Sequence, residues 1–387
     1  MAPLSRSENP DRSPDDSRRP PVYNRRVPEI QIEKAPMTRL SIPTPAQVTP
    51  ERIMQFAWGY VPPLVLEAAI RHRVFDTLDE GPKSVSEVSA ATGASERGLA
   101  AIMNALVGLG FLAKNERAVY SLTPESAAFL VSTKPAFQGG MIRHCSEHLI
   151  PRWLNLNEVV ATGLPVSAVN QEDSGSDFFQ NFVNDIFPQS YPAAKALAQH
   201  FNANGQSIET LAQPLRVPIR VLDLAAGSGV WGIALAQSSE RIHVTAVDWP
   251  GVIPVTQKTV ARFGLSGRFT FVEGDLQQAD FGDGHNLATL GHILHSEGEK
   301  RSRALLARTF ESLAPGGTIA IAEFVVNADR TGPVNALFFA VNMLVNTDTG
   351  DTYSFEEISS WLTEAGFINP RTLESPGPSP LILATKP

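Results

Sequence analysis

The feature that most constrains this fold is residues 221–229, which read Val-Leu-Asp-Leu-Ala-Ala-Gly-Ser-Gly. Aliphatic residues typical of a buried strand lead into small residues, and residues 230–237 then follow a helical pattern. Gly227 and Gly229 let the backbone turn and approach a ligand closely, because no Cβ intervenes. The helix that follows offers free N–H groups at the positive end of its dipole. The pattern predicts a strand–loop–helix unit that binds a ligand at the loop.

Strands and helices alternate from Pro218 to the end of the chain. This alternation is typical of an α/β fold with a mostly parallel sheet and helices on both faces, as in Rossmann-like domains. The expected strands are 219–224, 242–247, 269–273, 286–290, 318–324 and 381–385, and the expected helices are 230–237, 253–263, 300–313, 334–345 and 355–365.

The chain of 387 residues is long enough for two domains and a tail. Residues 1–48 are rich in Pro, Ser, Asp and Arg, so we expect a disordered tail. Residues 49–135 predict a mainly helical domain of winged-helix type, with helices near 85–92 and 96–109 and a small β-wing at 110–122. Residues 136–210 read as a helical linker and pocket wall, and residues 211–387 as the Rossmann-like domain.

Charge and composition exclude several other functions. The formal net charge is −8, and the exposed side of the second winged-helix helix carries Glu96, Arg97 and Asn104, so nucleic-acid binding is disfavoured. The single cysteine, Cys145, excludes an intrachain disulfide and a cysteine zinc cluster, and no metal is expected. We expect no signal peptide and no membrane span, and therefore a cytoplasmic protein.

The glycine loop alone leaves the ligand ambiguous. Asp248, about 20 residues after the glycines, suits hydrogen bonds to ribose hydroxyls. Residues 227–232 also match G-x-G-x-x-G, so an NAD-dependent oxidoreductase is an alternative. Asp223, which can receive a methionine amine, and the bulky Trp231 instead favour a sulfonium cofactor.

A third acid, in Asp275-Leu276, follows the third strand, where it could accept a hydrogen bond from an adenine amino group. Together these motifs resemble those of class I S-adenosylmethionine-dependent methyltransferases, specifically small-molecule O-methyltransferases with an N-terminal winged-helix dimerisation domain. Ala225 stands where that family usually has its first glycine. The resemblance implies S-adenosyl-L-methionine as cofactor, bound by Asp223, Gly227, Gly229, Asp248, Trp249, Asp275 and Leu276.

The resemblance also implies the residues around the methyl acceptor. Phe182, Ile186 and Ser190 match the family segment Phe-x-x-x-Met-x-x-x-Ser, in which the first two flank a flat substrate and the serine lies near the cofactor. Asn342 lies on one helical stripe with Asn335 and Asn346, which faces either the acceptor or solvent. Met141 and Trp153 are further pocket candidates.

The expected base is a histidine, because a phenol with a pKa near ~10 must lose its proton and histidine titrates near ~6.5. His295 follows the fourth strand at the family's catalytic position, and Glu323, after the fifth strand, would orient it. His292 is the competing candidate. The family's Asp-Trp after the histidine is replaced by Ser296-Glu297, and its second glutamate has no counterpart in residues 350–354.

We therefore expect methyl transfer to a hydroxyl of an aromatic or polycyclic small molecule. Carbon methylation of a flat, tetrapyrrole-like substrate and the NAD-dependent oxidoreductase are the alternatives. The resemblance further implies a homodimer with intertwined N-terminal domains, each lending pocket residues to its partner.

Overall fold

The computed structural model describes residues 48–170, 179, 182–203, 218–377 and 379–387. The predicted disordered tail, residues 1–48, lies outside this part of the chain except for its last residue. Helix α1 (Glu51–Ala57) lies almost wholly in a separate N-terminal unit of the chain, which ends at Phe56. The residues of α1 are exposed.

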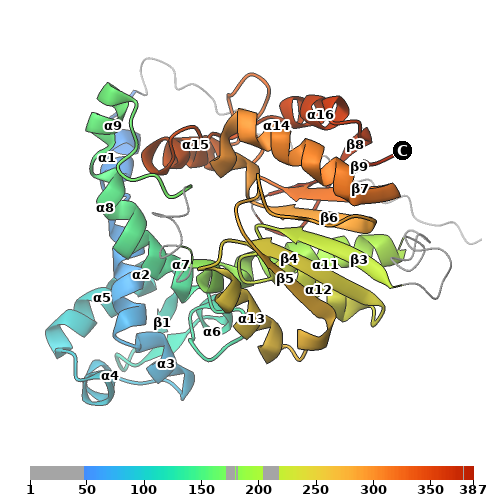
Figure 1. The fold of residues 1–387 in the computed structure, drawn as a ribbon. Coiled ribbons are helices and arrows are strands. Elements are labelled where there is room, and N and C mark those ends of the chain that lie inside the picture. Colours follow the sequence, from blue (N-terminus) through green and yellow to red (C-terminus); the bar gives the residue numbers. More distant parts are fainter. Residues whose placement is uncertain (1–47, 171–178, 180–181, 204–217, 378) are drawn as a thin grey trace, which may run out of the picture. The chain divides into compact units, whose positions relative to one another are not determined.

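A seven-stranded sheet forms the C-terminal domain, in the order β5-β4-β3-β6-β7-β9-β8 (Figure 1). Its five parallel strands are β3 (Ile219–Leu224), β4 (Ile242–Asp248), β5 (Phe269–Glu273), β6 (His285–Gly291) and β7 (Leu313–Ala322). The antiparallel β9 (Leu381–Thr385) and β8 (Ile368–Leu373) complete one edge. This arrangement confirms the predicted Rossmann-like α/β fold.

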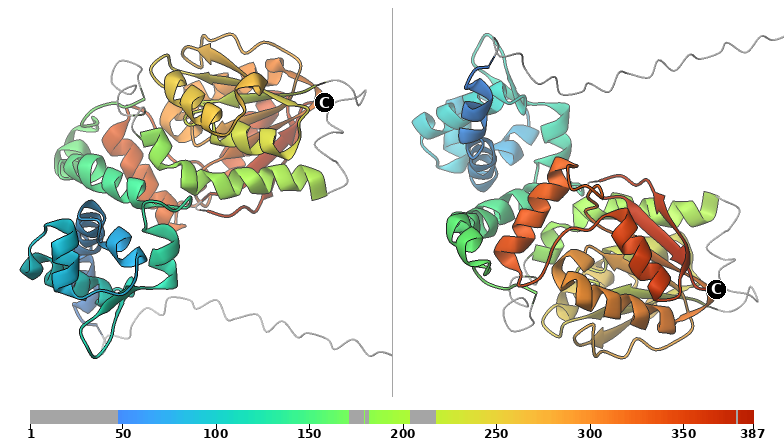
Figure 2. Two further views of the ribbon diagram at one scale, coloured as in Figure 1. Left: turned by 90° about the horizontal axis from the view of Figure 1, so that it is seen from below. Right: turned by 90° about the horizontal axis from the view of Figure 1, so that it is seen from above.

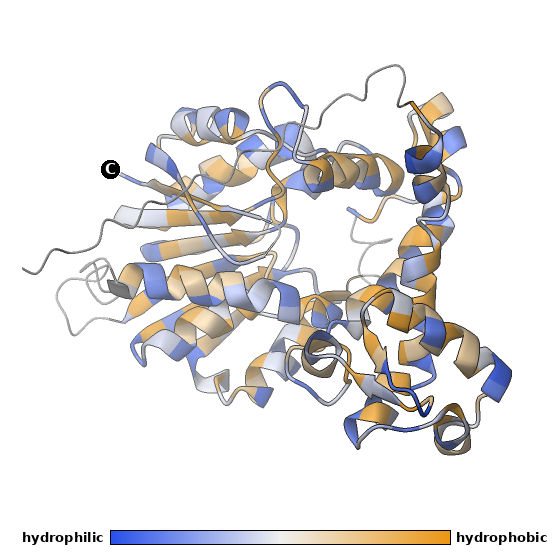
Figure 3. Cartoon of the chain, turned by 180° about the vertical axis from the view of Figure 1, so that it is seen from behind, coloured by the Kyte–Doolittle hydropathy of each residue, from blue (hydrophilic) through white to orange (hydrophobic). Residues whose placement is uncertain are grey.

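Side chains alternate between the two faces of the sheet, and each face has its own apolar core. Along β3, Val221 joins one cluster, and Leu222 and Leu224 join the other. The first core includes α11 (Phe187–Ala203) and α12 (Val230–Ser238), whereas the second includes α14 (Leu294–Ser312) and α16 (Phe355–Glu364). Figure 2 shows α11 running along one side of this domain, and Figure 3 shows the apolar residues along the strands.

Two differences from the expected boundaries affect the residues of the site. β7 ends at Ala322 rather than at residue 324, so Glu323 lies just beyond the strand. α14 begins at Leu294 rather than at residue 300, because a helical turn precedes the break at Gly298, where φ is 75° and ψ is 163°. His295 therefore stands in the first turn of α14 and not in a loop.

Strand β8 was not predicted from the sequence. It reads Ile-Asn-Pro-Arg-Thr-Leu and lies at the edge of the sheet, where its residues are largely exposed. Edge strands carry polar residues and proline more readily than central ones, so this strand lacks the apolar pattern of its neighbours.

The N-terminal domain has the predicted helical pair and β-wing. Its helices are α2 (Val61–Arg71), α3 (Val74–Asp79), α4 (Val85–Thr92), α5 (Glu96–Gly108) and α6 (Pro124–Phe129), and β1 (Leu112–Lys114) pairs antiparallel with β2 (Tyr120–Leu122). Ser84 caps α4 in a capping box with Glu87, and Ser95 caps α5. Leu99, Met103 and Leu106 on α5 are buried in its core, and their spacing of four and three residues places them on one face of the helix.

Within the described residues, one helical stretch, 51–71, has the length and composition that could cross a membrane, but only 6% of it is buried. Exposed apolar residues concentrate at its start, and they include Ile53, Met54, Phe56, Trp58 and Tyr60. A protein interface would bury such a surface.

A helical segment links the two domains and packs on α15 (Val334–Asn346). It consists of α7 (Gly139–His144), a π-helical turn η2 (Cys145–Leu149), α8 (Ile150–Trp153) and α9 (Leu156–Thr162). Trp153 Nε1 donates to Asn342 Oδ1 at 3.0 Å, and Arg152 donates to Asn346 Oδ1 at 2.8 Å. These bonds hold α8 against α15 and position the walls of the site.

Candidate active site

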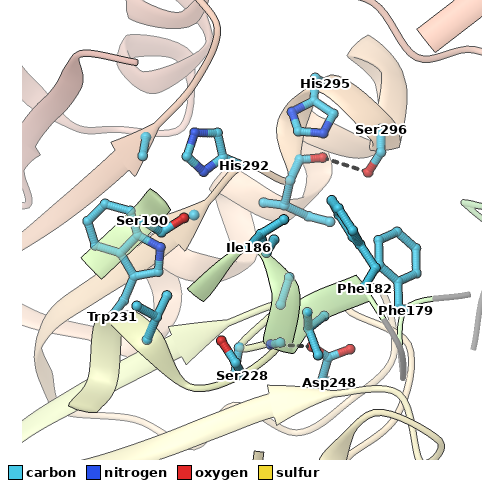
Figure 4. A pocket seen from close by; sticks show the side chains of 18 of the residues that line it. Phe179, Phe182, Ile186, Ser190, Ser228, Trp231, Asp248, His292, His295 and Ser296 are labelled. Carbon is cyan, nitrogen blue, oxygen red and sulfur yellow. Dashed lines mark hydrogen bonds between the residues drawn. The ribbon is translucent and has the colours of Figure 1, made fainter. Parts of the chain in front are cut away.

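A cavity of about 220 Å³ lies at the carboxyl end of the parallel strands (Figure 4). Loops that follow β3, β4, β5 and β6 supply one part of its lining, and helical segments before the sheet supply another. Its lining includes Met141, Asn170, Phe179, Phe182, Ile186, Ser190, Gly227, Ser228, Trp231, Asp248, Trp249, Asp275, Leu276, His292, His295, Ser296, Glu297, Arg301, Phe324, Phe339 and Ser379.

The glycine loop turns sharply beneath the cavity. Gly227 and Gly229 have φ values of 55° and 75°, which favour glycine, so the sequence needs glycine at both positions. Ala225, where the related family has glycine, adopts φ of 52° and so holds a strained conformation. Thr256 Oγ1 donates to the Gly227 carbonyl at 2.6 Å and fixes the loop.

Asp223 does not line the cavity, contrary to the prediction that it meets a methionine amine there. Its side chain is fully buried, and its two oxygens accept from Gly232 N at 2.9 Å and from Thr289 Oγ1 at 2.7 Å. Burial raises the pKa of Asp223 to about 7, although these hydrogen bonds oppose the rise. Its place is behind the loop, where it ties α12 to the sheet.

Asp248 lines the cavity at the end of β4, as predicted. Its carboxylate accepts from Gly227 N at 2.8 Å and from Trp249 N at 2.7 Å, so it also supports the glycine loop. Burial raises the pKa of Asp248 to about 6, and both hydrogen bonds oppose the rise. Trp249 lines the same wall and meets the Phe179 ring edge-on, with ring centroids 5.9 Å apart.

Asp275 and Leu276 also line the cavity, and here the structure adds two residues that the sequence did not single out. Arg301 donates to Asp275 Oδ2 at 2.9 Å and to Glu297 Oε2 at 2.7 Å. Both Arg301 and Glu297 face the cavity. The four-residue spacing of Glu297 and Arg301 is a signal for such a pair, although Gly298 breaks the helix between them.

The two predicted catalytic residues meet directly. His295 Nδ1 lies 2.8 Å from Glu323 Oε2, and Glu323 Oε1 accepts from the His295 backbone N–H at 3.3 Å. Burial favours the neutral form of Glu323, but the His295 ring beside it prevails and lowers the pKa of the carboxyl. With Nδ1–H donated to the carboxylate, Nε2 of His295 is left as a proton acceptor.

Backbone contacts fix the segment that carries His295. The His295 carbonyl accepts from Asp351 N at 2.9 Å, and the Ser296 carbonyl accepts from Asn170 Nδ2 at 3.0 Å. Ser296 Oγ donates to the Ile293 carbonyl at 3.1 Å, a bond drawn in Figure 4. The backbone that carries His295 is thus held by hydrogen bonds from several parts of the chain.

His292, the competing base, lies in a different environment. It has a φ of 61°, and its Nε2 is 3.0 Å from Ser379 Oγ rather than beside a carboxylate. Burial lowers the pKa of His292 to about 4, so its ring is neutral near pH 7. His292 therefore lacks the carboxylate partner that His295 has at Nδ1.

Aromatic side chains form the walls near His295. Phe324 and Phe339 stack with ring centroids 3.9 Å apart, and Phe339 meets His295 edge-on at 4.8 Å. Phe179 and Phe182 also line the cavity, and Figure 4 shows them beside each other. Phe324 and Phe339 were not singled out in the sequence, although Phe324 directly follows Glu323.

The remaining sequence candidates divide into two groups. Phe182, Ile186, Ser190 and Met141 line the cavity, as expected. Asn342 and Trp153 do not, because they bond to each other between α15 and α8. The asparagine stripe therefore faces the linking helices at Asn342 and Asn346, while Asn335 is exposed.

Comparisons with known proteins agree with this arrangement. Residues 153–368 match the model of the O-methyltransferase domain, and residues 54–132 match that of the O-methyltransferase dimerisation domain. The chain is 28% identical over 348 residues to 3-hydroxy-5-methyl-1-naphthoate 3-O-methyltransferase of Streptomyces sahachiroi, covering 88% of this chain and 97% of that protein. It is 28% identical to the tetracenomycin polyketide synthesis 8-O-methyl transferase of Streptomyces glaucescens, covering 87% and 97%.

Solved structures share the fold. The crystal structure of human N-acetylserotonin methyltransferase in complex with S-adenosylmethionine superposes with a TM-score of 0.69 at 25% identity, covering 89% of this chain and 99% of that one.

Proposed function

The chain belongs to the S-adenosylmethionine-dependent O-methyltransferases that carry an N-terminal dimerisation domain, and from this premise we propose that it methylates a phenolic hydroxyl of a flat aromatic or polycyclic molecule, with His295 as general base. The matching family model is that of an O-methyltransferase domain, which supports transfer to oxygen over carbon methylation and over an NAD-dependent oxidation.

The residues present suit this cofactor. A half-buried carboxylate, Asp248, faces the cavity beside the glycine loop, where ribose hydroxyls need an acceptor. Asp275 and Leu276 offer an acceptor and an apolar surface for an adenine. Ser190, Ser228 and Trp231 line the part of the cavity drawn to the left and below in Figure 4 and would enclose the rest of the molecule. When bound, S-adenosylmethionine supplies an already activated methyl group.

The protein's chemical task is then to position the acceptor hydroxyl and remove its proton. Nε2 of His295 would take that proton, while Glu323 keeps Nδ1 protonated and stabilises the positive charge that forms on the ring. The stacked Phe324 and Phe339 beside His295 and the rings of Phe179 and Phe182 suit a flat aromatic acceptor.

One observation supports this proposal more strongly than the others. The His295–Glu323 pair, joined at 2.8 Å, opens onto an aromatic-walled cavity that also contains the glycine loop. A histidine that merely filled space beside the sheet would need neither a buried carboxylate partner nor a place in this cavity.

The proposal is tested with labelled S-adenosylmethionine and a panel of naphthols, hydroxyanthraquinones and catechols. We expect transfer of the methyl group to oxygen. We also expect His295→Ala to lower kcat by roughly 10²–10⁴-fold, while the affinity for S-adenosylhomocysteine (AdoHcy), the cofactor without its methyl group, stays nearly unchanged. Unchanged turnover in this variant would remove His295 from the mechanism.

The dimerisation domain and the exposed apolar residues at 53–60 support a homodimer. Light scattering after gel filtration should give twice the chain mass at micromolar concentration. A monomer under these conditions would contradict this part of the proposal.

A further inference from the structure

Charge is unevenly distributed around the cavity. Three carboxylates, Asp248, Asp275 and Glu297, line it, and Arg301 is the one Lys or Arg among its described lining residues. The guanidinium of Arg301 bonds to Glu297 at 2.7 Å and to Asp275 at 2.9 Å. Its positive charge is therefore already matched by two carboxylates at the end of the cavity assigned to the cofactor.

The acceptor part of the cavity, which we define by Met141, Asn170, Phe179, Phe182, Ser296, Phe324 and Phe339 around His295, contains apolar and uncharged polar groups. The sequence has no Lys or Arg between Arg152 and Lys195, the span that supplies Asn170 and two of the phenylalanines. Arg152 itself donates to Asn346 and does not line the cavity.

The two histidines supply no free positive charge. His292 is neutral near pH 7, since burial lowers its pKa to about 4. Any proton that His295 takes is matched by Glu323, which is buried beside it. The charge of the bound cofactor must lie beside the reacting hydroxyl, so it cannot also match an anionic group elsewhere on the acceptor.

We propose that this cavity selects uncharged aromatic hydroxyl compounds and rejects the same ring systems when they carry a carboxylate. The proposal rests on the proposed function and specifies its substrate class. Moving a carboxylate out of water without a partner cation is unfavourable, and the acidic lining adds repulsion. The phenylalanine walls retain the flat ring of a neutral compound.

This proposal distinguishes the chain from one of its relatives. The Streptomyces sahachiroi protein is named for a naphthoate, an aromatic carboxylate, at 28% identity to this chain. We expect the two proteins to differ in the charge of the acceptor that they take, although they share the family's reaction.

The test compares matched acceptors that differ only in charge. 6-Hydroxy-2-naphthoate and its methyl ester are titrated into the full-length protein saturated with AdoHcy, and a hydroxyanthraquinone carboxylate and its ester provide a second pair. We expect the esters to bind about tenfold more tightly or better. Equal or tighter binding of the carboxylates overturns the proposal, as does a failure of all four compounds to bind.

A charge-restoring variant makes the cause testable. Met141 lines the cavity one turn before His144, whose ring packs on Phe182 at 4.1 Å. Met141→Lys should narrow or reverse the preference for the ester, whereas the uncharged Met141→Gln should keep it. The same preference in both variants would show that charge does not set the selection.

Methyl transfer to the same compounds separates this inference from the proposed function. Esters that bind selectively but are not methylated would contradict the proposed reaction and leave the charge selection intact. Carboxylates methylated as fast as the esters would leave the reaction intact and overturn the charge selection.

Discussion

Replacing Glu323 with glutamine tests the link between the buried carboxylate and the base. The Glu323→Gln variant keeps the size of the side chain but removes its charge, 2.8 Å from His295 Nδ1. A hydrogen bond to a charged group contributes roughly 1.5–3 kcal/mol. If this stabilisation is realised only when His295 carries the proton, kcat should fall by about 10- to 150-fold.

The assay separates the chemical step from binding. Steady-state kinetics with saturating cofactor should show the loss in kcat, while titration calorimetry should show AdoHcy affinity close to that of the wild type, because Glu323 does not line the cavity. The exposed Glu356→Gln is the matched control and should change neither value. A Glu323→Gln variant with wild-type kcat would refute the argument that the carboxylate assists His295.

Three further predictions follow from the geometry around the glycine loop. Gly291→Ala should weaken AdoHcy binding and lower Tm, because the new Cβ would lie 1.9 Å from Trp231 Nε1. Calorimetry and thermal melting measure the two effects. Gly267→Ala is the control and should change neither value, because there is open space around Gly267. Arg301→Met should weaken AdoHcy binding by about tenfold with kcat little changed, since it frees Asp275 and Glu297 from their shared cation; unchanged affinity would remove Arg301 from the cofactor site. The pKa of Asp223 is raised to about 7 in the folded protein, so folding favours the protonated form of this residue. The free energy of unfolding of the wild type should therefore fall relative to that of Asp223→Asn as pH rises from about 4 to about 7. Denaturant unfolding that gives the same pH dependence for both proteins would contradict this.

The central strands were predictable, because each is a short apolar run ended by an acid or a glycine, whereas the edge strand β8 was not. Since parallel strands end at one edge of a sheet, the sequence also predicted that His295 and Glu323 lie close together, and the structure brings them within 2.8 Å. The cavity-lining positions of Asp248 and Asp275 were predictable on the same grounds.

Other parts of the site depend on choices that a sequence pattern leaves open. Asp223 is at the end of a strand like Asp248, but its side chain points behind the loop and bonds to Thr289 on the neighbouring β6. Asn342 is on a polar stripe of α15, yet which element covers that stripe is decided by the packing of α8. Arg301 lies just beyond the break in α14 at Gly298, so its place in the cavity lining depends on how the two parts of this helix are oriented.

We propose that one cavity brings the cofactor's ribose to Asp248 and the reacting hydroxyl to His295. A crystal structure of the protein with AdoHcy and an uncharged naphthol would show both contacts at once. We predict ribose hydroxyls within hydrogen-bond distance of Asp248 and an acceptor oxygen between the AdoHcy sulfur and His295 Nε2. AdoHcy bound away from Asp248, or an acceptor oxygen out of reach of His295, would contradict the account.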